Sequence, residues 1–420
     1  MLEVVHQQLK EHYYDPTFHG VDVDARYQAY LQRLEQAPNL GEAYRLINDY
    51  LAGLGDPQTF FVAPGDAYFH ENGYRMAVIG DRCFITEVRP GSDAAKELHP
   101  GDQVLSIDGR PVSRRNFGEV KYLLSLVLEP ATELALLSPT GTPRVVRVAT
   151  ARKINPELSS GPLGPDVSSP GLADRAEDLL AQRAREYGDL VVWKMRFFLT
   201  STVTIDRMVK FARKHKVLIL DLRGNPGGGV GALKFFQGSL FDYEAMLGRL
   251  EYNIHSEDLL MYMVGSLFDQ DVKLGRRVSR GREQVLVAKT KGRRAFGGQL
   301  FVLVDGGTAT DAELFARIIQ SEHRGTIVGD VTAGSIGLSR CWPTYPESSI
   351  CVSLIEPSVI MEGSKGLNGV GVTPDVMILP TADDLAAGRD PVLARAAELA
   401  GVKLDPTAAG KMFPLAWSPF

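Results

Sequence analysis

The stretch VLILDLRGNPGGG, residues 217–229, decides the fold class of this chain. Its first four residues form an uninterrupted apolar run, which is typical of a parallel strand covered on both faces. Three successive glycines follow, and glycine permits positive φ angles and a close backbone approach to a ligand. The stretch therefore predicts a buried strand ending in a turn whose N–H groups suit an oxyanion or a phosphate. A simple tight turn explains the glycines equally well, and the missing Lys-Ser/Thr pair excludes a Walker loop.

Two further apolar runs extend this pattern toward the C-terminus. Residues 300–304 and 326–329 have the composition of buried strands. Apolar residues at helical spacing predict helices over 231–236 and 312–320. Because strands alternate with helices, we expect βαβ units and an α/β core over residues 189–420.

The first part of the chain divides into a helical segment and a β-rich module. Residues 1–66 carry apolar side chains at three- and four-residue spacing, and Asn39 with Glu42 resembles a helix N-terminal signature. Residues 67–152 contain short β-rich runs separated by Pro-Gly and Asp-Gly turns. These runs are 75–79, 83–88, 103–107, 133–137 and 144–149. They predict a small β-barrel module with one or two helices.

A linker separates this module from the α/β core. Residues 153–188 begin with a Pro-, Gly- and Ser-rich stretch, and the later part predicts a helix from Leu172 to Tyr187. At roughly 150 residues per domain, the length of 420 residues predicts two to three domains. When the linker is counted separately, we expect four consecutive regions, at 1–66, 67–152, 153–188 and 189–420.

Charge and hydropathy exclude several classes of function. The chain has a net charge of −5 and a pI near 6.0, so no basic surface recruits nucleic acid or anionic lipid. No run of 18 apolar residues is present, which argues against a membrane span. The first seven residues, MLEVVHQ, lack the apolar run of a secretory signal. These features predict a cytoplasmic protein.

The cysteines argue against structural cross-links. Cys83, Cys341 and Cys351 are odd in number and show no CxxC spacing. The pattern predicts neither a disulfide framework nor a zinc site. We expect Cys341 to be buried and inert. No other motif predicts a metal or a cofactor.

Three further motifs join the glycine-rich turn. The stretch DGGTATDAE, residues 305–313, follows a strand and places the Thr310 hydroxyl at the carboxyl edge of the sheet, where α/β folds bind ligands. A helix cap formed by Thr310 or Asp311 explains it equally well. The turns within 90–109 and the stretch GVGVTPD at 369–375 complete the set.

Together the four motifs resemble the C-terminal processing, or tail-specific, serine peptidases, including their tricorn-like branch. The segment 90–109 is similar to a PDZ module, and LGDPQT at 54–59 matches the end of the helical start in that family. The resemblance covers nearly the whole chain. It implies a helical N-terminal segment, an inserted PDZ-like β-barrel module and a protease-like α/β core. It also implies that an extended peptide adds to a sheet edge of the module. Residues 74–76, which are Tyr74, Arg75 and Met76, would form its carboxylate-facing loop.

The chain departs from the family at the residues that perform the chemistry. In the tricorn-like branch, histidine, serine and glutamate are expected where this chain has Gln58, Thr310 and Asn368. The other branch uses a serine–lysine dyad, and its lysine would fall at Ser335. Glutamine cannot accept a proton as imidazole does, and an unassisted hydroxyl is a poor nucleophile. The β-methyl of threonine also crowds the path of attack.

These departures favour a catalytically inactive homologue that binds a peptide or an unfolded segment and holds or presents it. The alternative is an active endopeptidase with Thr310 as nucleophile and an unidentified base, for which His323 and Lys365 are candidates. Cys341 is a candidate substitute nucleophile. A third interpretation is another acyl transfer or a cyclisation in the same pocket. Homo-oligomer formation is compatible with each of them.

The binding apparatus of the family is retained in the sequence. By resemblance, the N–H groups of Gly227 and Gly228, with that of Asp311, form the oxyanion hole. We expect these groups to hold a peptide carbonyl or a carboxylate even without catalysis. We also expect Gln58, Thr310 and Asn368 to converge within hydrogen-bonding distance of one another.

Overall fold

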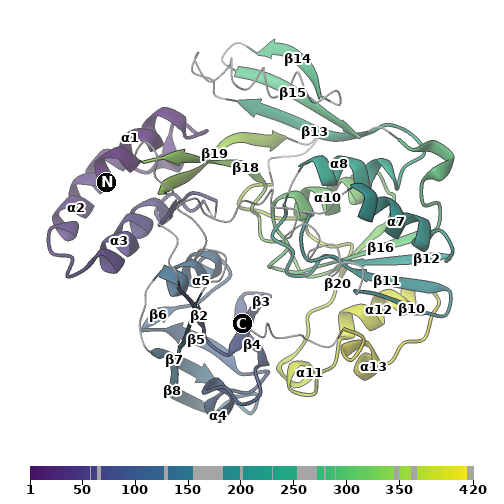
Figure 1. The fold of residues 1–420 in the computed structure, drawn as a ribbon, viewed down its shortest axis with the longest axis horizontal. Coiled ribbons are helices and arrows are strands. Elements are labelled where there is room, and N and C mark those ends of the chain that lie inside the picture. The colour runs from purple at the N-terminus through teal and green to yellow at the C-terminus, as the bar shows by residue number, and fades with distance from the viewer. Residues whose placement is uncertain are drawn as a thin grey trace.

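The structure is a computed structural model of the chain. It describes residues 1–56, 58–63, 68–126, 131–154, 183–198, 202–228, 230–252, 272–278, 281–288, 290–344, 350–360 and 367–413. Helices and sheets are mixed, as the sequence predicts. Figure 1 shows N-terminal helices, a β-rich module below them and a C-terminal core beside both.

A six-stranded sheet forms the centre of the C-terminal core. Its order is β10-β11-β12-β16-β17-β20, and the pairs β11–β12, β12–β16 and β16–β17 are parallel. The strands are β10 (Ala184–Tyr187), β11 (Leu190–Lys194), β12 (Val217–Asp221), β16 (Gln299–Val304), β17 (Thr326–Gly329) and β20 (Val376–Met377). Every residue of β12 is buried. The apolar run at the start of 217–229 is therefore a central strand, as predicted.

Helices cover both faces of this sheet, because successive strand residues point to opposite faces. Leu218 and Leu220 of β12 pack into one cluster with three helices, whereas Val217 and Ile219 pack on the opposite face. The helices of the first face are α7 (Thr202–Ala212), α8 (Val230–Gly238) and α10 (Thr310–Ser321). Those of the second face are α12 (Pro391–Leu399) and α13 (Pro406–Gly410), which follow α11 (Ala382–Ala386).

A second sheet connects the core to the N-terminal helices. Its order is β1-β19-β13-β15-β14, with β18 paired to β19. The strands are β1 (Phe60–Val62), β13 (Ala245–Tyr252), β14 (Val272–Val278), β15 (Gly281–Ala288), β18 (Gly337–Pro343) and β19 (Cys351–Ile360). The short helix η3 (Gly292–Arg294) precedes β16.

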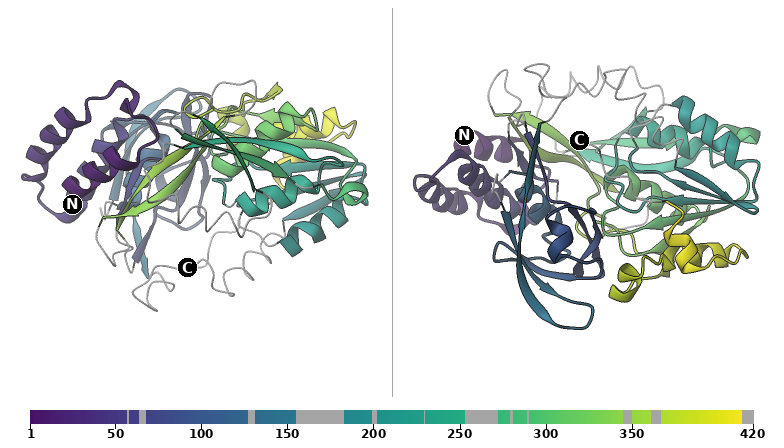
Figure 2. Two further views of the ribbon diagram at one scale, coloured as in Figure 1. Left: turned by 90° about the horizontal axis from the view of Figure 1, so that it is seen from above. Right: turned by 60° about the horizontal axis from the view of Figure 1, so that its bottom comes forward.

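The N-terminal helices pack on β18 and β19. They are α1 (Leu2–His12), the short η1 (Phe18–Gly20), α2 (Val23–Leu34) and α3 (Leu40–Ala52). Leu9 and Tyr50 share one apolar cluster with Trp342 and Val352, and Figure 2 shows the helices against these strands. Asn39 caps α3 by accepting the Glu42 N–H at 2.9 Å, so the predicted helix start is confirmed.

The β-rich module is an open sheet and not the predicted barrel. Its path runs β3-β4-β5-β7-β8, with β6 on β5, and within the described residues the end strands β3 and β8 are not paired with each other. Its elements are β3 (Tyr74–Ile79), β4 (Arg82–Val88), α4 (Ala94–Glu97), β5 (Gln103–Ile107), β6 (Arg110–Pro111), α5 (Phe117–Leu126), β7 (Ala131–Leu137) and β8 (Pro143–Ala149). A separate ribbon pairs β2 (Tyr68–Glu71) with β9 (Ala151–Ile154). Apolar residues of the strands pack with residues of α4 and α5 in one cluster. The sheet therefore has a core without closing into a barrel.

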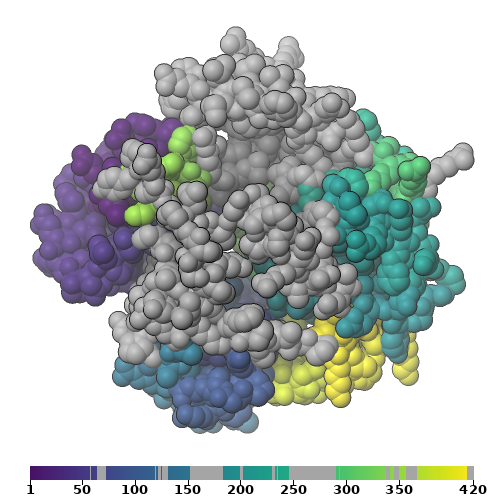
Figure 3. Space-filling model, in the orientation of Figure 1, coloured from purple at the N-terminus to yellow at the C-terminus, as the bar shows by residue number. Residues whose placement is uncertain are grey.

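Arg114 fastens the module to the core. Its guanidinium donates to the Gly80 carbonyl at 2.7 Å, to the Val331 carbonyl at 2.8 Å and to the Asp330 carboxylate at 2.5 Å. Asp330 also accepts the Gly80 N–H at 2.8 Å. The contact therefore joins the module to the segment that follows β17. In the view of Figure 3, the blue module and the purple helices lie toward the left and bottom, and the teal part of the core lies on the right.

Two predictions about the linker and the cysteines need correction. Residues 184–187, placed in a helix by the sequence pattern, form β10 and pair with β11 across the turn at Gly188. The earlier part of that predicted helix lies outside the described residues. Tertiary pairing with a buried strand here overrides local helical propensity.

Cys341 and Cys351 form a disulfide, with their Cα atoms 5.5 Å apart, so the prediction of no disulfide is wrong. Cys341 is also exposed, whereas the sequence predicted that it would be buried. The pairing of β18 with β19 brings these two positions together across adjacent strands. Cys83 is buried as a thiol, and burial raises its pKa to about 12. Among the described residues, no helix has the length and apolar character needed to cross a membrane.

Candidate functional site

Two strand-to-helix turns meet at the carboxyl edge of the core sheet. One follows β12 and the other follows β16. The Gly224 N–H donates to Asp305 at 2.8 Å, and the Thr308 hydroxyl donates to the Leu222 carbonyl at 3.0 Å. These cross-bonds hold the two motifs 221–228 and 305–311 together, at the edge where the sequence placed them.

A buried ion-pair network supports the first turn. Asp221 is completely buried and accepts two bonds at 2.8 Å from the Arg223 guanidinium, while Lys194 lies 3.7 Å away. Arg223 also binds Asp390, which caps α12. Burial raises the pKa of Asp221, but Arg223 and Lys194 outweigh it and hold that pKa far below its usual range. Through Asp390, the network connects the turn after β12 to α12 on the second face of the core sheet.

Thr310 stands at the first position of α10 in a strained conformation. Its φ angle is +50°, which is a rare value for a β-branched residue. Its hydroxyl donates to the Pro226 carbonyl at 2.6 Å. The helix cap is Ala309, without a side-chain bond, so the alternative of a cap formed by Thr310 is wrong. A Cβ atom on Gly227 would lie 1.5 Å from the Thr310 hydroxyl, so this glycine is required for close approach.

The structure brings Gln58, Ser335 and Thr310 together around one carbonyl. The Gln58 side-chain amide donates to the Ser335 carbonyl at 2.5 Å, and the Thr310 N–H donates to the same oxygen at 3.1 Å. Gln58 is 5% exposed and Ser335 is 6% exposed. The predicted base position, nucleophile position and lysine position therefore share one buried contact.

Asn368 belongs to a neighbouring network. Its side-chain amide donates to the Tyr14 hydroxyl at 3.2 Å, and its Oδ1 atom is buried without a hydrogen-bond partner. In the described part of the chain, no hydrogen bond joins Asn368 directly to Gln58 or Thr310. The predicted convergence is therefore indirect for Asn368, since it reaches the site through the N-terminal tyrosines.

Tyr13, Tyr14 and His19 are site residues that sequence reasoning missed. The Tyr14 hydroxyl lies 2.8 Å from His19 Nε2, and the Tyr13 hydroxyl donates to Asp56 at 3.0 Å. Burial raises the pKa of Tyr13 well above its usual range, and the Asp56 charge adds to this. His19 has a φ angle of +54°. No motif signals these residues, because they enter the site from a turn distant in sequence.

Glu313 is a second missed residue and organises the loop after β17. It is completely buried and accepts bonds from the Thr332 hydroxyl, from the Gly334 N–H at 2.7 Å and from the Ser335 N–H at 2.9 Å. Burial raises the pKa of Glu313 to about 7, although its hydrogen bonds act in the opposite direction. Glu313 thereby positions the Ser335 peptide that Gln58 and Thr310 contact. Its place one helical turn after Thr310 is the signal that sequence reasoning overlooked.

Two of the three amides predicted to form the oxyanion hole have internal partners. The Gly227 N–H donates to Asn225 Oδ1 at 2.8 Å, and the Gly228 N–H donates to Asp311 Oδ2 at 3.2 Å. The Asp311 side chain thus binds another turn and does not cap its own helix. The N–H of Asp311 has no hydrogen-bond acceptor within the described stretches. Burial raises the pKa of Asp311, and the Gly228 bond partly offsets this.

The predicted peptide-facing residues 74–76 lie on an outer strand of the module. Tyr74 is buried, and Arg75 pairs with Glu87 at 3.5 Å. Met76 packs against the apolar cluster of the module. Among the described strands, β3 pairs with β4 alone, so its outer edge faces away from the sheet. This geometry suits the addition of an extended peptide strand.

The three substitute residues proposed from sequence lie elsewhere. His323 follows the C-terminal end of α10, and that end lies about 16.5 Å along the helix from Thr310 at 1.5 Å per residue. Cys341 is held in the disulfide. Lys365 lies outside the described residues. Among the described residues, no group of three His, Cys, Asp or Glu side chains is arranged to hold a metal.

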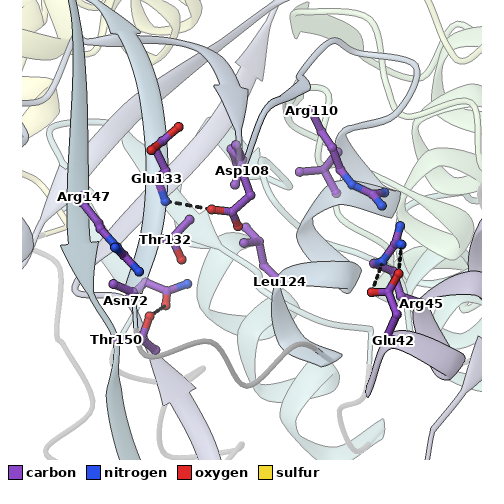
Figure 4. A pocket seen from close by; sticks show the side chains of 13 residues that line it. Glu42, Arg45, Asn72, Asp108, Arg110, Leu124, Thr132, Glu133, Arg147 and Thr150 are labelled. Atoms are coloured by element: carbon purple, nitrogen blue, oxygen red, sulfur yellow. Dashed lines mark hydrogen bonds and ion pairs between the residues drawn. The ribbon is translucent and has the colours of Figure 1, made fainter. Parts of the chain in front are cut away.

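A separate cavity of about 620 Å³ lies between α3 and the module. Figure 4 shows Glu42 and Arg45 of α3 on one side of it and Glu133 and Arg147 of the module on the other. Arg45 pairs with Glu42, and Asp108 accepts the Glu133 N–H at 2.8 Å. Its lining comes from the N-terminal helices and the module. It is therefore distinct from the site at the carboxyl edge.

Comparison with known proteins identifies each part. Residues 193–378 match peptidase family S41. The core is therefore similar to an S41 peptidase domain. Residues 70–120 match the PDZ domain, and residues 1–52 match the tricorn protease C1 domain. The predicted resemblance to C-terminal processing and tricorn-like peptidases is confirmed by these matches.

Two relatives match most of this chain. A tricorn protease homologue of Streptomyces coelicolor is 22% identical to this chain. The matched region covers 93% of this chain and 31% of that relative. The chloroplastic C-terminal processing peptidase of Tetradesmus obliquus is 24% identical over 88% of this chain and 74% of its own length. The chain therefore corresponds to less than a third of the first relative.

Solved structures share the fold. Mature CPAF superposes with a TM-score of 0.66 at 17% identity, covering 92% of this chain and 94% of CPAF. The photosystem II D1 C-terminal processing protease has a TM-score of 0.52 at 20% identity, covering 90% and 92% of the two chains. These similarities show that the chain shares its fold with these two proteins. The chemistry depends on the residues at the site itself.

Proposed function

We propose that this S41 homologue is catalytically inactive and binds a peptide or an unfolded polypeptide segment, which it holds or presents. The observation that carries the proposal is the bond from the Thr310 hydroxyl to the Pro226 carbonyl at 2.6 Å. A backbone carbonyl cannot take up a proton near neutral pH, so it does not activate the hydroxyl for attack. The neighbouring Gln58 directs its amide to the Ser335 carbonyl and offers no base either.

The pocket nevertheless has unused hydrogen-bonding capacity. The Asp311 N–H is a donor without a partner in the described chain, and Asn368 Oδ1 is a buried acceptor without one. A bound polypeptide supplies a carbonyl oxygen for the Asp311 N–H and a backbone N–H for Asn368 Oδ1. Unpaired buried polar groups are costly, so a ligand that pairs them gains affinity. The outer edge of β3 in the PDZ domain supports a longer contact with the same segment.

The test combines a reactive probe with cleavage and binding assays. A fluorophosphonate probe should leave Thr310 unmodified, and the wild type should cleave a peptide library no faster than Thr310→Ala. Equilibrium binding of the same library should be detectable. Sustained cleavage that Thr310→Ala abolishes would contradict inactivity, and the absence of any binding would contradict the peptide-binding role.

A reconstructed site is the matched positive control. The triple variant Gln58→His, Thr310→Ser and Asn368→Glu restores the residue types of the active family. We expect it to react with the probe where the wild type does not. Probe labelling of the triple variant shows that the assay can detect a working site on this scaffold.

An active endopeptidase with Thr310 as nucleophile is the second candidate. The observation in its favour is the imidazole of His19, which reaches Asn368 through the Tyr14 hydroxyl. If this histidine serves as base, peptide cleavage should be measurable and should disappear in both Thr310→Ala and His19→Asn. Loss in Thr310→Ala alone would leave the base unidentified.

Location and assembly stay predictions. The disulfide between Cys341 and Cys351 is typical of oxidising compartments and argues against the cytoplasmic location expected from sequence. Cell fractionation tests the location. Light scattering of the purified chain tests whether it forms a homo-oligomer.

A further inference from the structure

The carboxylate of Asp311 occupies the position at which a ligand oxygen would bind the Gly228 amide. We propose that Asp311 is a specificity-determining residue: it excludes carboxylate groups from this amide and leaves the pocket to uncharged peptide carbonyls. The inference rests on the proposed peptide-binding function and makes it narrower. It selects internal peptide segments over free carboxyl termini at the S41 core.

The geometry of the turn supports this role. Asp311 Oδ2 accepts the Gly228 N–H at 3.2 Å, and the residue is 6% exposed. A Cβ atom on Gly227 would lie 3.1 Å from the Asp311 nitrogen, so the Asp311 amide faces the same turn. An incoming oxygen that uses the Asp311 N–H therefore arrives beside the Asp311 carboxylate.

The charge of Asp311 is not compensated by a neighbouring cation. Its one hydrogen-bond donor is the Gly228 amide, and no charged side chain of the described residues contributes to its pKa. The acidic side chain that follows Asp311 on its own helix is Glu313, and Asp56 lies two residues before Gln58. A second anion placed beside Asp311 meets like-charge repulsion in a poorly hydrated site. An uncharged carbonyl does not meet this repulsion.

Selective labelling makes the Gly228 amide directly observable. Four glycines in the chain directly follow another glycine, namely Gly228, Gly229, Gly298 and Gly307. Protein grown with glycine carrying ¹³C at the carbonyl and ¹⁵N at the amide therefore gives four amide signals in a carbonyl-correlated NMR spectrum. Gly228 is identified as the signal that changes most in Asp311→Asn.

Two peptides of identical sequence provide the comparison. One has a free carboxyl terminus, and the other is amidated at that end. At pH 7.5 we expect the amidated peptide to shift the Gly228 signal, and we expect the free acid to need about tenfold or more higher concentration for the same shift. Asp311→Asn should bring the two peptides within about threefold of each other, because Asn lacks the charge. Asp383→Asn removes one exposed carboxylate of α11 and should leave the difference unchanged.

The outcomes separate this inference from the proposed function. Without peptide, the Gly228 signal should titrate with pH in the wild type and not in Asp311→Asn. If the signal titrates but neither peptide moves it, the peptide-binding function is wrong and the Asp311 contact stands. If both peptides move the wild-type signal equally, or if the signal does not titrate, Asp311 has no role in selection.

Discussion

Asp221 and Asp311 are buried carboxylates on adjoining turns of one site, yet their surroundings differ in kind. Asp221 is enclosed by Arg223 and Lys194, whereas Asp311 has one backbone N–H as its partner. Burial with cations lowers the pKa of the first, and burial without them raises the pKa of the second. The comparison shows that the support beneath the pocket is saturated with partners. At the site itself, the Asp311 N–H and Asn368 Oδ1 have no partner among the described residues, so a ligand can bind them.

The largest expected effect comes from removing the cation beside Asp221. Arg223→Ala leaves a fully buried carboxylate without its main partner and also frees Asp390. We expect the free energy of unfolding to fall by about 3–5 kcal/mol. Urea denaturation measures it, with Arg395→Ala as control, because Arg395 forms an exposed pair with Glu398. A loss as small as that of the control would mean that Asp221 does not depend on charge compensation.

Glu313 lies between the two extremes, because it is held by several hydrogen-bond donors and by no cation. Its folded pKa of about 7 exceeds its ordinary value of 4.5, so the folded chain binds the proton more tightly than the unfolded chain. Its contribution to stability is therefore complete below about pH 4.5 and is lost as the pH rises through 7, by on the order of 3 kcal/mol. Glu313→Gln should remove this component from the curve of stability against pH. The control Glu398→Gln should keep it, and an unchanged curve in Glu313→Gln would place the titration elsewhere.

The contact of Arg114 with Asp330 tests the same contrast at the boundary between the PDZ domain and the core. Arg114 is 21% exposed, so water screens its charge more than that of Arg223. Arg114→Ala should lower the free energy of unfolding by about 1–2 kcal/mol. Arg115→Ala, which removes an exposed neighbour, should change it by less than about 0.5 kcal/mol. Equal effects of the two variants would show that the boundary contact is not specific.

The smallest effect is expected for Asp311 itself. Because burial raises the pKa of Asp311, the ionised form is disfavoured in the folded chain. Asp311→Asn removes that charge and should stabilise the fold at pH 8 by less than about 1 kcal/mol. Urea denaturation at pH 8 and pH 5 should show that the gain diminishes at the lower pH, because the raised pKa brings protonation of the carboxylate closer. A large destabilisation would instead assign Asp311 a structural role like that of Asp221.

The sequence predicted the parts of the fold that depend on local pattern. The apolar run at 217–220 became a central strand, and the alternation of strands with helices became the α/β core. The barrel was wrong, because short strands separated by turns fit an open sheet equally well. Residues 184–187 were placed in a helix, because pairing with β11 is invisible in local spacing.

The candidate site was predictable in its membership but not in its contacts. Resemblance selected Gln58, Thr310 and Ser335, and the structure joins them through one carbonyl. The disulfide and the Tyr14–His19 pair escaped prediction, since each connects positions that chain reversal or helix packing brings together.

What the sequence alone determined was the order of strands and helices, together with the chemical types at each catalytic position. Both follow from local periodicity and from residue identity. The tertiary structure decided which hydrogen-bonding groups stay unpaired. Asp311 turns toward Gly228 and the Thr310 hydroxyl toward Pro226 because two distant turns are pressed together at the edge of one sheet. Pairing of this kind depends on distances between segments, which residue order along the chain does not contain.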